Sequence, residues 1–429
     1  MPGKLLFISY YWPPSGGPGA LRAVKFARHL PRFGWQPIVL TVRRGEFPFR
    51  DEQLGRELPP ECKVVRTANL DPFALYKRLT GGAIDSALPV GQLSLAPANR
   101  RERAAAWIRA NLFLPDARVG WVPFAVFRGV RLAREGKVDL LFTSSPPHSL
   151  QIAGWLIKAL TGLPWVADLR DPWTGIRYYQ FVSRSAATRA LDRSLERRIL
   201  RSADRVVTVS PALAREFGRL GAGPVAVVPN GYDADDFPPR SERPHFIVAH
   251  TGNLPAAQNP RTLWQALRLV LERRADLVKD LRIRLIGRVD VSILDTLSQA
   301  GLDHYLENAP FMPHEQVTRE MMDAALLLVS IPNVENNRGI VTGKLFEYIG
   351  TGNPVLVLGP ADGDAGQVAR AIGNARLFGY DRIEECAEFI ERIYTAWQRG
   401  ELPRTSPAER EPFSRISLTR KLSHVFNEL

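Results

Sequence analysis

The chain has 429 residues, which is too long for one ordinary hydrophobic core, so two domains are the natural expectation. Its 45% hydrophobic and 24% charged residues are those of a globular protein and argue against fibrous and disordered classes. Cys62 and Cys386 are the two cysteines. Their number and separation disfavour a disulfide framework and a cysteine metal site, and fit a reducing compartment.

The formal net charge of +13 is unevenly distributed. Residues 1–235 hold 34 basic and 19 acidic residues (+15), whereas the remainder holds 57 − 34 = 23 basic and 44 − 19 = 25 acidic residues (−2). The basic half indicates an anionic partner, such as an anionic membrane surface or a phosphorylated acceptor carried on it. An arginine-rich proteome would give the same excess. Nucleic acid is not expected, because the basic residues form no dense tract and no familiar motif.

Short apolar runs alternate with helical patterns along the chain, which predicts βαβ units and parallel sheets. Two successive doubly wound, Rossmann-like α/β domains, joined by a linker over 230–245, are the simplest account. Ligands bind beyond the carboxyl ends of strands in such sheets, so a site in a cleft between the domains is expected. The expected strands are residues 4–10, 36–42, 63–67, 138–144, 164–169, 205–210 and 225–231, then 246–252, 281–287, 306–311, 325–331 and 354–359.

A glycine-rich turn follows the first strand and precedes a helix. Gly16 and Gly17 would let a ligand approach the backbone, and Arg22 is the first basic residue of the helix, a pattern compatible with phosphate. The spacing is not that of a dinucleotide fingerprint, so a nicotinamide enzyme is disfavoured.

Further on, basic and apolar residues mix at near-helical spacing within 72–120. They predict either a membrane-surface helix or ordinary helices packed on the sheet.

Polar residues follow the fourth and fifth strands, in "TSSPPHSL" and "ADLRDPW". His148 could orient an acceptor hydroxyl or exchange its proton, or have only a local role at a helix N-terminus. A cleft-facing Asp168 or Asp171 could position a sugar hydroxyl, and Arg170 could pair with phosphate. The alternative for this second loop is a structural ion pair.

No metal-ligand spacing, nucleophile elbow or P-loop occurs in the sequence. The clustered carboxylates of "GYDADDF" (231–237) lie in the expected linker and are predicted to be solvated. We therefore expect no metal and no cofactor.

The stretch from Arg338 to Leu358 places glycines around a predicted helix that carries Lys344 and Glu347. A helix N-terminus binds anions, a lysine can meet phosphate, and a carboxylate can accept hydrogen bonds from hydroxyls. This pattern suggests a phosphorylated sugar or a nucleotide. A surface helix with an ion pair between residues three apart is the alternative.

Six segments together resemble the retaining family-4-type glycosyltransferases of GT-B fold, over nearly the whole chain. The resemblance implies an acceptor-binding N-terminal domain (1–235), a domain that binds a nucleotide-sugar donor (236–410), and a terminal helix that returns to the first domain (411–429). It implies metal-independent transfer with retention and without an enzyme nucleophile. The segments are residues 8–30, 193–217, 227–237, 247–254, 342–358 and 413–429.

On the donor side of this resemblance, Glu347 matches the glutamate that holds the ribose diol. The backbone N–H groups of Gly339, Ile340, Val341 and Gly343 match the segment beside the distal phosphate and the donor sugar.

On the acceptor side, Gly16 and Gly17 match the loop that abuts the diphosphate and the acceptor. Asp168 belongs to a segment that carries an active-site histidine in many relatives; Arg170 stands at about that place, with His148 as a stand-in.

The chain departs from the family pattern in two places. Gly339 stands where the first of the family's paired glutamates is usual. After the first strand of the second domain, the family has an arginine and a lysine for the diphosphate, and Asn253 and Gln258 or Asn259 stand at about those positions. Arg261, Arg288 or Lys344 could supply the missing charge.

The sequence thus predicts a cytoplasmic glycosyltransferase, peripheral at the inner face of the membrane, that acts in surface polysaccharide or glycoconjugate synthesis. Its partners would be a nucleotide-sugar donor and a glycan or lipid-linked acceptor. A nucleotide-sugar 2-epimerase, a non-catalytic sugar-nucleotide-binding protein and a nucleic-acid binder remain open alternatives.

Overall fold

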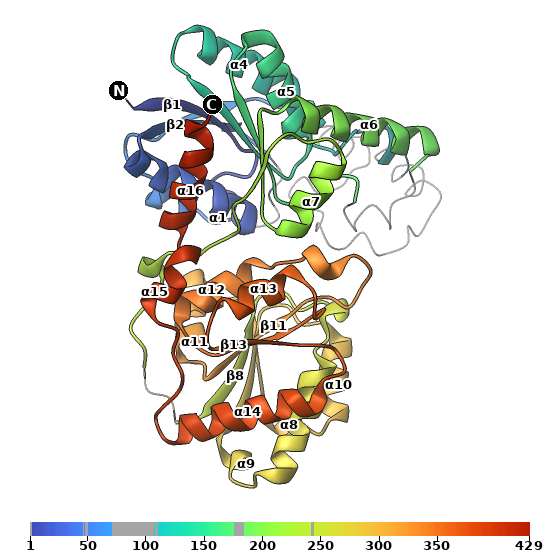
Figure 1. Cartoon of the computed structure of the whole chain (residues 1–429), viewed down its shortest axis with the longest axis vertical. Coiled ribbons are helices and arrows are strands. Elements are labelled where there is room, and N and C mark those ends of the chain that lie inside the picture. The colour runs from blue at the N-terminus through green and yellow to red at the C-terminus, as the bar shows by residue number, and fades with distance from the viewer. Residues whose placement is uncertain are drawn as a thin grey trace. The chain divides into compact units, whose positions relative to one another are not determined.

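A computed structural model of the chain describes residues 2–45, 47, 50–70, 107, 110–175, 184–241 and 244–429. These residues form two compact units (Figure 1). Unit 1 comprises Met1–Val228 with Thr419–Leu429, and unit 2 comprises Pro229–Leu418. The domain boundaries expected from the sequence, 235/236 and 410/411, stay predictions.

Unit 1 is built on a seven-stranded parallel sheet of order β3-β2-β1-β4-β5-β6-β7. The strand order reverses between β1 and β4, which are hydrogen-bonded neighbours in the sheet. In an open α/β sheet, this point of reversal is where ligands bind. The strands are β1 Gly3–Ile8, β2 Trp35–Val42, β3 Lys63–Thr67, β4 Leu140–Ser145, β5 Trp165–Leu169, β6 Arg205–Thr208 and β7 Val225–Val227.

Helices cover both faces of this sheet, because successive side chains of a strand point to opposite faces. In β5, Trp165, Ala167 and Leu169 face the core shared with α4, α5, α6 and α7. Asp168 points to the other face, where α1 lies. The helices are α1 Pro18–His29, α4 Val122–Arg134, α5 Ser149–Thr161, α6 Ala186–Ser202 and α7 Pro211–Arg219.

Unit 2 repeats the architecture with a six-stranded parallel sheet of order β10-β9-β8-β11-β12-β13. One face packs on α8, α10 and α14, and the other on α11, α12 and α13. The strands are β8 Phe246–Thr251, β9 Leu281–Ile286, β10 Leu306–Ala309, β11 Leu326–Ser330, β12 Val355–Leu358 and β13 Ala375–Phe378. The helices are α8 Arg261–Arg273, α9 Leu277–Asp280, α10 Val291–Gln299, α11 His314–Asp323, α12 Gly343–Thr351, α13 Asp364–Arg370, α14 Ile383–Gln398 and α15 Pro407–Arg410. Helix α16, Arg415–Asn427, begins in unit 2 and passes into unit 1 at Thr419.

The predicted fold class, two doubly wound parallel α/β domains, is confirmed, and each of the twelve predicted strands is present. The sequence analysis missed β13, a four-residue strand at the edge of the second sheet. Its register leaves Arg376 exposed, so it lacks the continuous apolar run of a buried parallel strand.

The predicted linker over 230–245 is wrong at its start, because residues 229 onward belong to unit 2. Tyr232 packs in the core of that unit, and the side chain of Asp233 is only 4% exposed. The expected solvation therefore holds for Asp235 but not for Asp233.

The helices expected within 72–120 lie mostly outside the described residues, so their membrane reading stays a prediction. In the described part of the chain, no helix is both long and apolar enough to cross a membrane.

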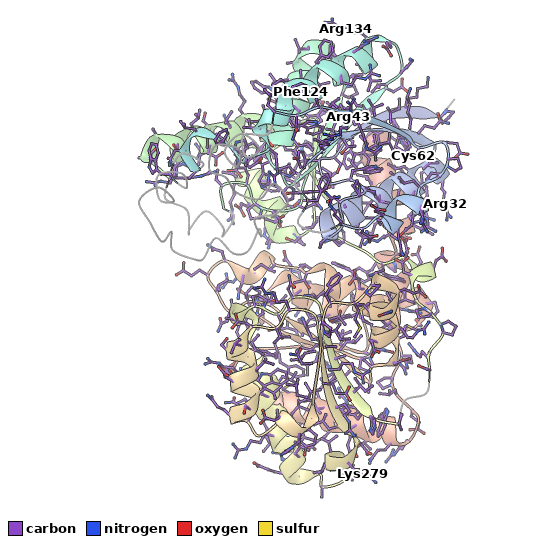
Figure 2. All side chains as sticks on the ribbon, turned by 180° about the vertical axis from the view of Figure 1, so that it is seen from behind. Arg32, Arg43, Cys62, Phe124, Arg134 and Lys279 are labelled. Carbon is purple, nitrogen blue, oxygen red and sulfur yellow. The ribbon has the colours of Figure 1, made fainter. Side chains whose placement is uncertain are left out.

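Cys62 and Cys386 are free thiols, and Cys62 lies just before β3 (Figure 2). Burial raises the pKa of Cys62 to about 11 and that of Cys386 to about 12.

The end of α16 completes the core of unit 1. Phe426 is 2% exposed and makes edge contacts with Trp35 and Phe142, at ring-centroid distances of 5.5 and 5.2 Å. Arg420 lies over the ring of Phe33, with its guanidinium carbon 5.6 Å from the ring centre. The last turns of the chain thus supply aromatic packing to β2 and β4.

We predict that Phe426→Ala lowers the free energy of unfolding of unit 1 by about 3–5 kcal/mol, because it removes a buried aromatic ring and leaves a cavity. Chemical denaturation followed by tryptophan fluorescence measures this loss. Phe127→Ala is the matched control, because the Phe127 side chain is 72% exposed and its removal should change stability by less than about 0.5 kcal/mol. Equal effects of the two substitutions would contradict the packing role of the terminal helix.

Candidate functional site

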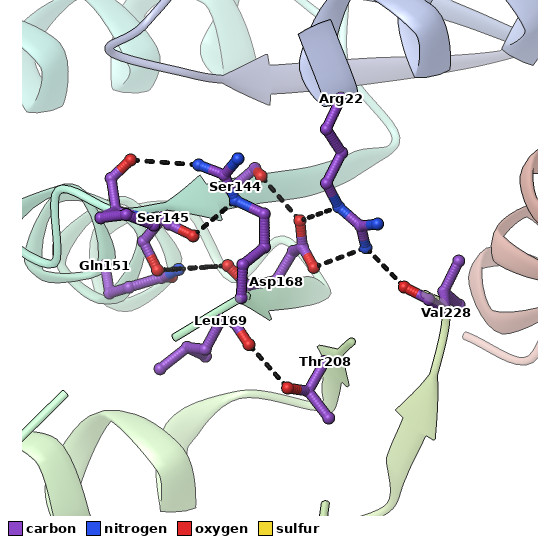
Figure 3. Close-up of polar contacts among 10 residues, drawn as sticks. Arg22, Ser144, Ser145, Gln151, Asp168, Leu169, Thr208 and Val228 are labelled. Atoms are coloured by element: carbon purple, nitrogen blue, oxygen red, sulfur yellow. Dashed lines mark hydrogen bonds and ion pairs between the residues drawn. The ribbon is translucent and has the colours of Figure 1, made fainter. Parts of the chain in front are cut away.

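The carboxyl edge of the first sheet is organised around Asp168, at the end of β5 (Figure 3). Arg22 of α1 donates to both carboxylate oxygens, from Nε to Oδ2 at 3.1 Å and from Nη2 to Oδ1 at 3.0 Å. Ser144 Oγ donates to Oδ2 at 2.6 Å. The Arg22 side chain is 1% exposed and that of Asp168 is 0% exposed. Asp168 therefore does not face open space as the sequence analysis expected, and its predicted catalytic role stays a prediction.

Arg22 was expected to suit phosphate at the start of α1. In the structure its guanidinium points inward instead, and Nη2 also donates to the carbonyl of Val228 at 2.8 Å. These bonds tie α1 to the ends of β5 and β7. The buried pair satisfies its own charges, so Arg22 and Asp168 hold the sheet edge together.

Arg170, two residues beyond Asp168, joins the loops that follow β4 and β1. Its Nε donates to the carbonyl of Ser145 at 2.8 Å and its Nη2 to that of Pro146 at 3.3 Å. The guanidinium packs against Gly19, where a Cβ atom would lie 3.2 Å from Nη2. Burial lowers the pKa of Arg170, and the nearby Asp168 opposes this shift.

His148 precedes α5 and is buried against Trp173. The two rings stack with centroids 5.3 Å apart and an interplanar angle of 12°. Neither ring nitrogen makes a hydrogen bond of ordinary geometry with a described residue. Burial lowers the pKa of His148, which favours the neutral imidazole. A neutral ring can accept a proton, which is compatible with the predicted role.

Asp116, which the sequence analysis did not single out, caps the start of α5. Its Oδ2 accepts from the backbone N–H of Ser149 at 2.9 Å, and its Oδ1 accepts from Ser149 Oγ at 2.9 Å. Because Asp116 and Ser149 are 33 positions apart in the sequence, no local sequence pattern predicts this cap. It fixes the helix start that carries His148.

The glycine loop after β1 has the conformation that only glycine adopts readily. Gly17 has φ 85° and ψ 174°, and it forms the N-cap of α1. A Cβ atom on Gly16 would lie 3.0 Å from Cβ of Asp51. The loop is thus shaped by its own packing, and its predicted contact with the donor and acceptor stays a prediction.

The carboxyl edge of the second sheet differs, because two glycines there bring backbone segments into contact. Gly252 follows β8 with φ 93°, and Gly287 follows β9 with φ 115°. A Cβ atom on Gly287 would lie 2.7 Å from the carbonyl oxygen of Gly252, and one on Gly252 would lie 2.7 Å from Cε of Lys344. The two loops can meet, and can receive the lysine, only because both positions lack side chains.

Lys344, in the first turn of α12, reaches across to this glycine pair. Its Nζ donates to the carbonyl of Asn253 at 2.9 Å. Burial lowers the pKa of Lys344 to about 8, and Glu347 opposes the shift. His250, at the end of β8, lies close by; burial first and Lys344 second lower its pKa to about 3. The neutral His250 therefore adds no charge beside the ammonium.

Helix α12 is anchored to β8 at its core side and open at its N-terminus. The backbone N–H of Thr251 donates to Tyr348 Oη at 2.9 Å, and burial raises the pKa of Tyr348 to about 12. Thr342 is the N-cap residue, and no side chain caps the helix. Its first N–H groups carry the positive end of the helix dipole and suit an anion.

The remaining predicted donor-side residues lie around this edge. Glu347 is half-buried, one turn along α12 from Lys344, and its carboxylate makes no hydrogen bond or ion pair with a described residue. The alternative reading, a capped surface ion pair, therefore does not describe it well. Exposed side chains at the edge are those of Asn253 after β8, Arg261 at the start of α8, and Arg288 after β9.

Gly339, Ile340 and Val341 form the approach to α12. Gly339 ends the short helix Asn337–Gly339, and the next two residues are half-buried. Gly343 begins α12 itself. The structure thus brings the predicted donor-side segment to one edge of one sheet.

Comparison with known proteins adds a family and a fold to this geometry. Residues 93–236 match the model of Glycosyltransferase Family 4. No curated protein sequence matches the chain. Many solved structures share its fold.

Three of these structures are similar over nearly the whole chain. Sucrose-phosphate synthase from Thermosynechococcus elongatus has a TM-score of 0.62 and 16% identity, with 99% of this chain and 98% of that chain covered. HepE of Anabaena, solved in complex with UDP-glucose, has a TM-score of 0.62 and 14% identity over 99% and 100%. A glycosyltransferase from Rickettsia africae has a TM-score of 0.63 and 13% identity over 99% and 98%.

These matches show that the chain has the GT-B fold. The family match, which covers residues 93–236, agrees with this fold. The resemblance inferred from the sequence is confirmed at this level.

We predict that Asp168→Asn lowers the free energy of unfolding by about 3–5 kcal/mol, because it leaves the buried Arg22 without a counter-charge. The double variant Arg22→Met with Asp168→Asn should recover part of this loss, since it removes both charges. Urea denaturation of the two single variants and the double variant measures the coupling. As a control, Arg268→Ala breaks an exposed pair with Glu272 and should cost less than about 1 kcal/mol. An Asp168→Asn protein as stable as wild type would rule out this structural role.

Proposed function

We propose that this protein transfers a sugar from a nucleotide-diphosphate sugar to an acceptor hydroxyl. One observation carries the proposal: an uncapped helix N-terminus, the Lys344 ammonium and the Glu347 carboxylate lie together at the carboxyl edge of the second sheet. Among the described residues, the Glu347 carboxylate has no hydrogen-bond partner. The first two suit a diphosphate, and the third suits vicinal hydroxyls of a ribose. The family match and the GT-B fold support the same conclusion.

The charge of the leaving diphosphate is the chemical problem that such a site must solve. The Lys344 ammonium uses one of its three N–H groups on the Asn253 carbonyl and keeps two for phosphate oxygens. Arg288 and Arg261 are exposed on neighbouring loops and could add charge. Lys344 would thus replace, from α12, the cation that relatives place after the first strand of this domain. In our proposal this charge makes a metal and a cofactor unnecessary.

The finer parts of the proposal come from the family resemblance. Transfer would proceed with retention, as departure of the diphosphate runs ahead of attack by the acceptor from the same face. His148 and Arg170 would act on the acceptor side, beside the loop of Gly16 and Gly17. The acceptor would be a glycan or a lipid-linked sugar in surface polysaccharide or glycoconjugate synthesis. The protein would work in the cytoplasm, at an anionic membrane surface.

A product assay tests the proposal directly. The purified chain is incubated with UDP-, GDP- and ADP-sugars, with and without hydroxyl acceptors, and the products are separated by chromatography and identified by mass and by NMR, which distinguishes epimers of equal mass. Acceptor-dependent appearance of a glycosylated product supports transfer. An isomerised donor without any acceptor would identify the epimerase alternative, and binding without turnover would identify a non-catalytic protein.

We predict that Glu347→Ala weakens binding of the preferred nucleotide diphosphate at least tenfold, about 1.4 kcal/mol, because the ribose hydroxyls lose their acceptor. Isothermal titration calorimetry measures the change. Glu388→Ala, an exposed glutamate on α14, is the charge-matched control and should leave affinity unchanged. Unaltered binding by the Glu347 variant would remove the ribose assignment.

We predict that nucleotide-diphosphate affinity falls about tenfold between pH 7 and pH 9, because Lys344 loses its proton around its pKa of about 8. Affinity should fall as the pH rises, because the charged form of the lysine binds the anion. This form predominates below the pKa and is lost above it. Titrations across this range with wild type and with Lys344→Met provide the measurement. The variant should bind weakly and with little dependence on pH in this range. A wild-type affinity that does not change with pH would contradict the role of Lys344.

A further inference from the structure

Helix α6, labelled in Figure 1, belongs to unit 1 and carries five arginines. All five are exposed. The two acidic residues of the helix, Asp192 and Glu196, are each only 1% exposed. The outward face of α6 is therefore purely cationic. The arginines are Arg189, Arg193, Arg197, Arg198 and Arg201.

The acids of α6 point inward because each has a partner there. Asp192 accepts a hydrogen bond from Trp173 Nε1 at 2.8 Å and pairs with Arg184. Glu196 accepts from the backbone N–H of Thr174 at 3.3 Å and from the hydroxyl of that residue. These carboxylates are fixed inside unit 1, so they are not available to form ion pairs on the outward face of the helix.

Four of the arginines form one row along the helix. Arg189 and Arg201 begin and end a series with a spacing of four residues, which places neighbours on the same ridge. At 1.5 Å per residue, the row spans about 18 Å. Arg193 and Arg197, in its middle, make no hydrogen bond or ion pair with a described residue. Their guanidinium groups are therefore available for external anions.

Large apolar side chains are exposed on α6 and on the helices that precede it. They are Leu191 on α6, Leu160 on α5 and Phe127 on α4, with exposed fractions of 53%, 55% and 72%. Arg198 also stacks over Trp155 of α5, at 5.3 Å from the ring centre. Leu191 lies two residues from Arg189 and from Arg193, so it flanks the arginine row instead of lying on its ridge. Arginines with an apolar side chain beside them suit the headgroup region of a bilayer, where both are accommodated. A nucleic-acid duplex would use the charge but give Leu191 no role.

We propose that the arginine row of α6 docks unit 1 on a bilayer of anionic phospholipids. This inference rests on the membrane part of the proposed function and names the surface that performs it. The guanidinium groups bind headgroup phosphates, with two parallel N–H donors for each phosphate where the geometry permits. Residues 236–429, which include nearly all of unit 2, have a net charge of only −2, which fits attachment through the basic unit 1.

Vesicle sedimentation tests the proposal with the full chain and without nucleotide. Vesicles of phosphatidylcholine alone are compared with vesicles of phosphatidylcholine and phosphatidylglycerol in equal parts. The protein should bind the anionic vesicles only, and high salt should release it. Arg193→Gln with Arg197→Gln should weaken partition about 25-fold, since each arginine near the surface contributes about 1 kcal/mol, or about fivefold.

Two further variants separate charge at α6 from other effects. Arg193→Lys with Arg197→Lys keeps the charge and should keep most of the binding. Arg268→Gln with Arg392→Gln removes the same charge from exposed positions of unit 2 and should leave partition unchanged. Thermal melts of all variants establish that each is folded.

Three results would overturn the proposal: no binding of wild type to anionic vesicles at low salt, undiminished binding by the glutamine variant, or an equal loss in the unit 2 control. Tight binding to duplex DNA in place of vesicles would identify the other class of partner. Vesicle binding that persists in a protein without transfer activity would remove the proposed function and leave the docking surface. Transfer to a soluble acceptor without vesicle binding would support the proposed function and overturn the docking surface.

Discussion

The close approach of the Gly252 and Gly287 backbones, at the edge of the second sheet, is the constraint on which the proposed donor site depends. It leaves room for the Lys344 side chain, whose ammonium donates to the carbonyl of Asn253. Burial lowers the pKa of this lysine. The lysine belongs to the helix that also presents Glu347, so one rigid element carries both groups. Tyr348 fixes that element to β8. A cation and a carboxylate are therefore held at a fixed separation, as recognition of a phosphate and a ribose requires.

The two sheets use their charges differently. At the edge of the first, the Arg22–Asp168 pair is buried and satisfied, and Arg170 is bound to carbonyls. The bonds that these groups make stabilise the loops of unit 1. At the edge of the second, the carboxylate of Glu347 and two N–H groups of Lys344 have no protein partner among the described residues. Groups left unsatisfied in this way favour a charged and hydroxylated ligand on unit 2.

The strands and many of the candidate site residues could be predicted from the sequence where the pattern that determines them is local. Short apolar runs identified twelve strands, among them the half-exposed β3, whereas β13, a strand of four residues at the sheet edge, was missed. Lys344 and Glu347 were found together because three residues separate them on one helix. The partner of Asp168 could not be predicted from a local pattern, because Arg22 lies 146 residues away in the sequence.

Amide hydrogen exchange of the full chain, with and without saturating UDP, GDP or ADP, tests the central claim most directly. The account predicts that one of these nucleotides slows exchange at the N-terminus of α12 and in the loops that follow β8 and β9, where Lys344 and Gly252 meet. Protection in these segments would locate the donor site on the geometry described above. Protection elsewhere in unit 2, such as beside β13, or no protection by any of the three nucleotides, would contradict it.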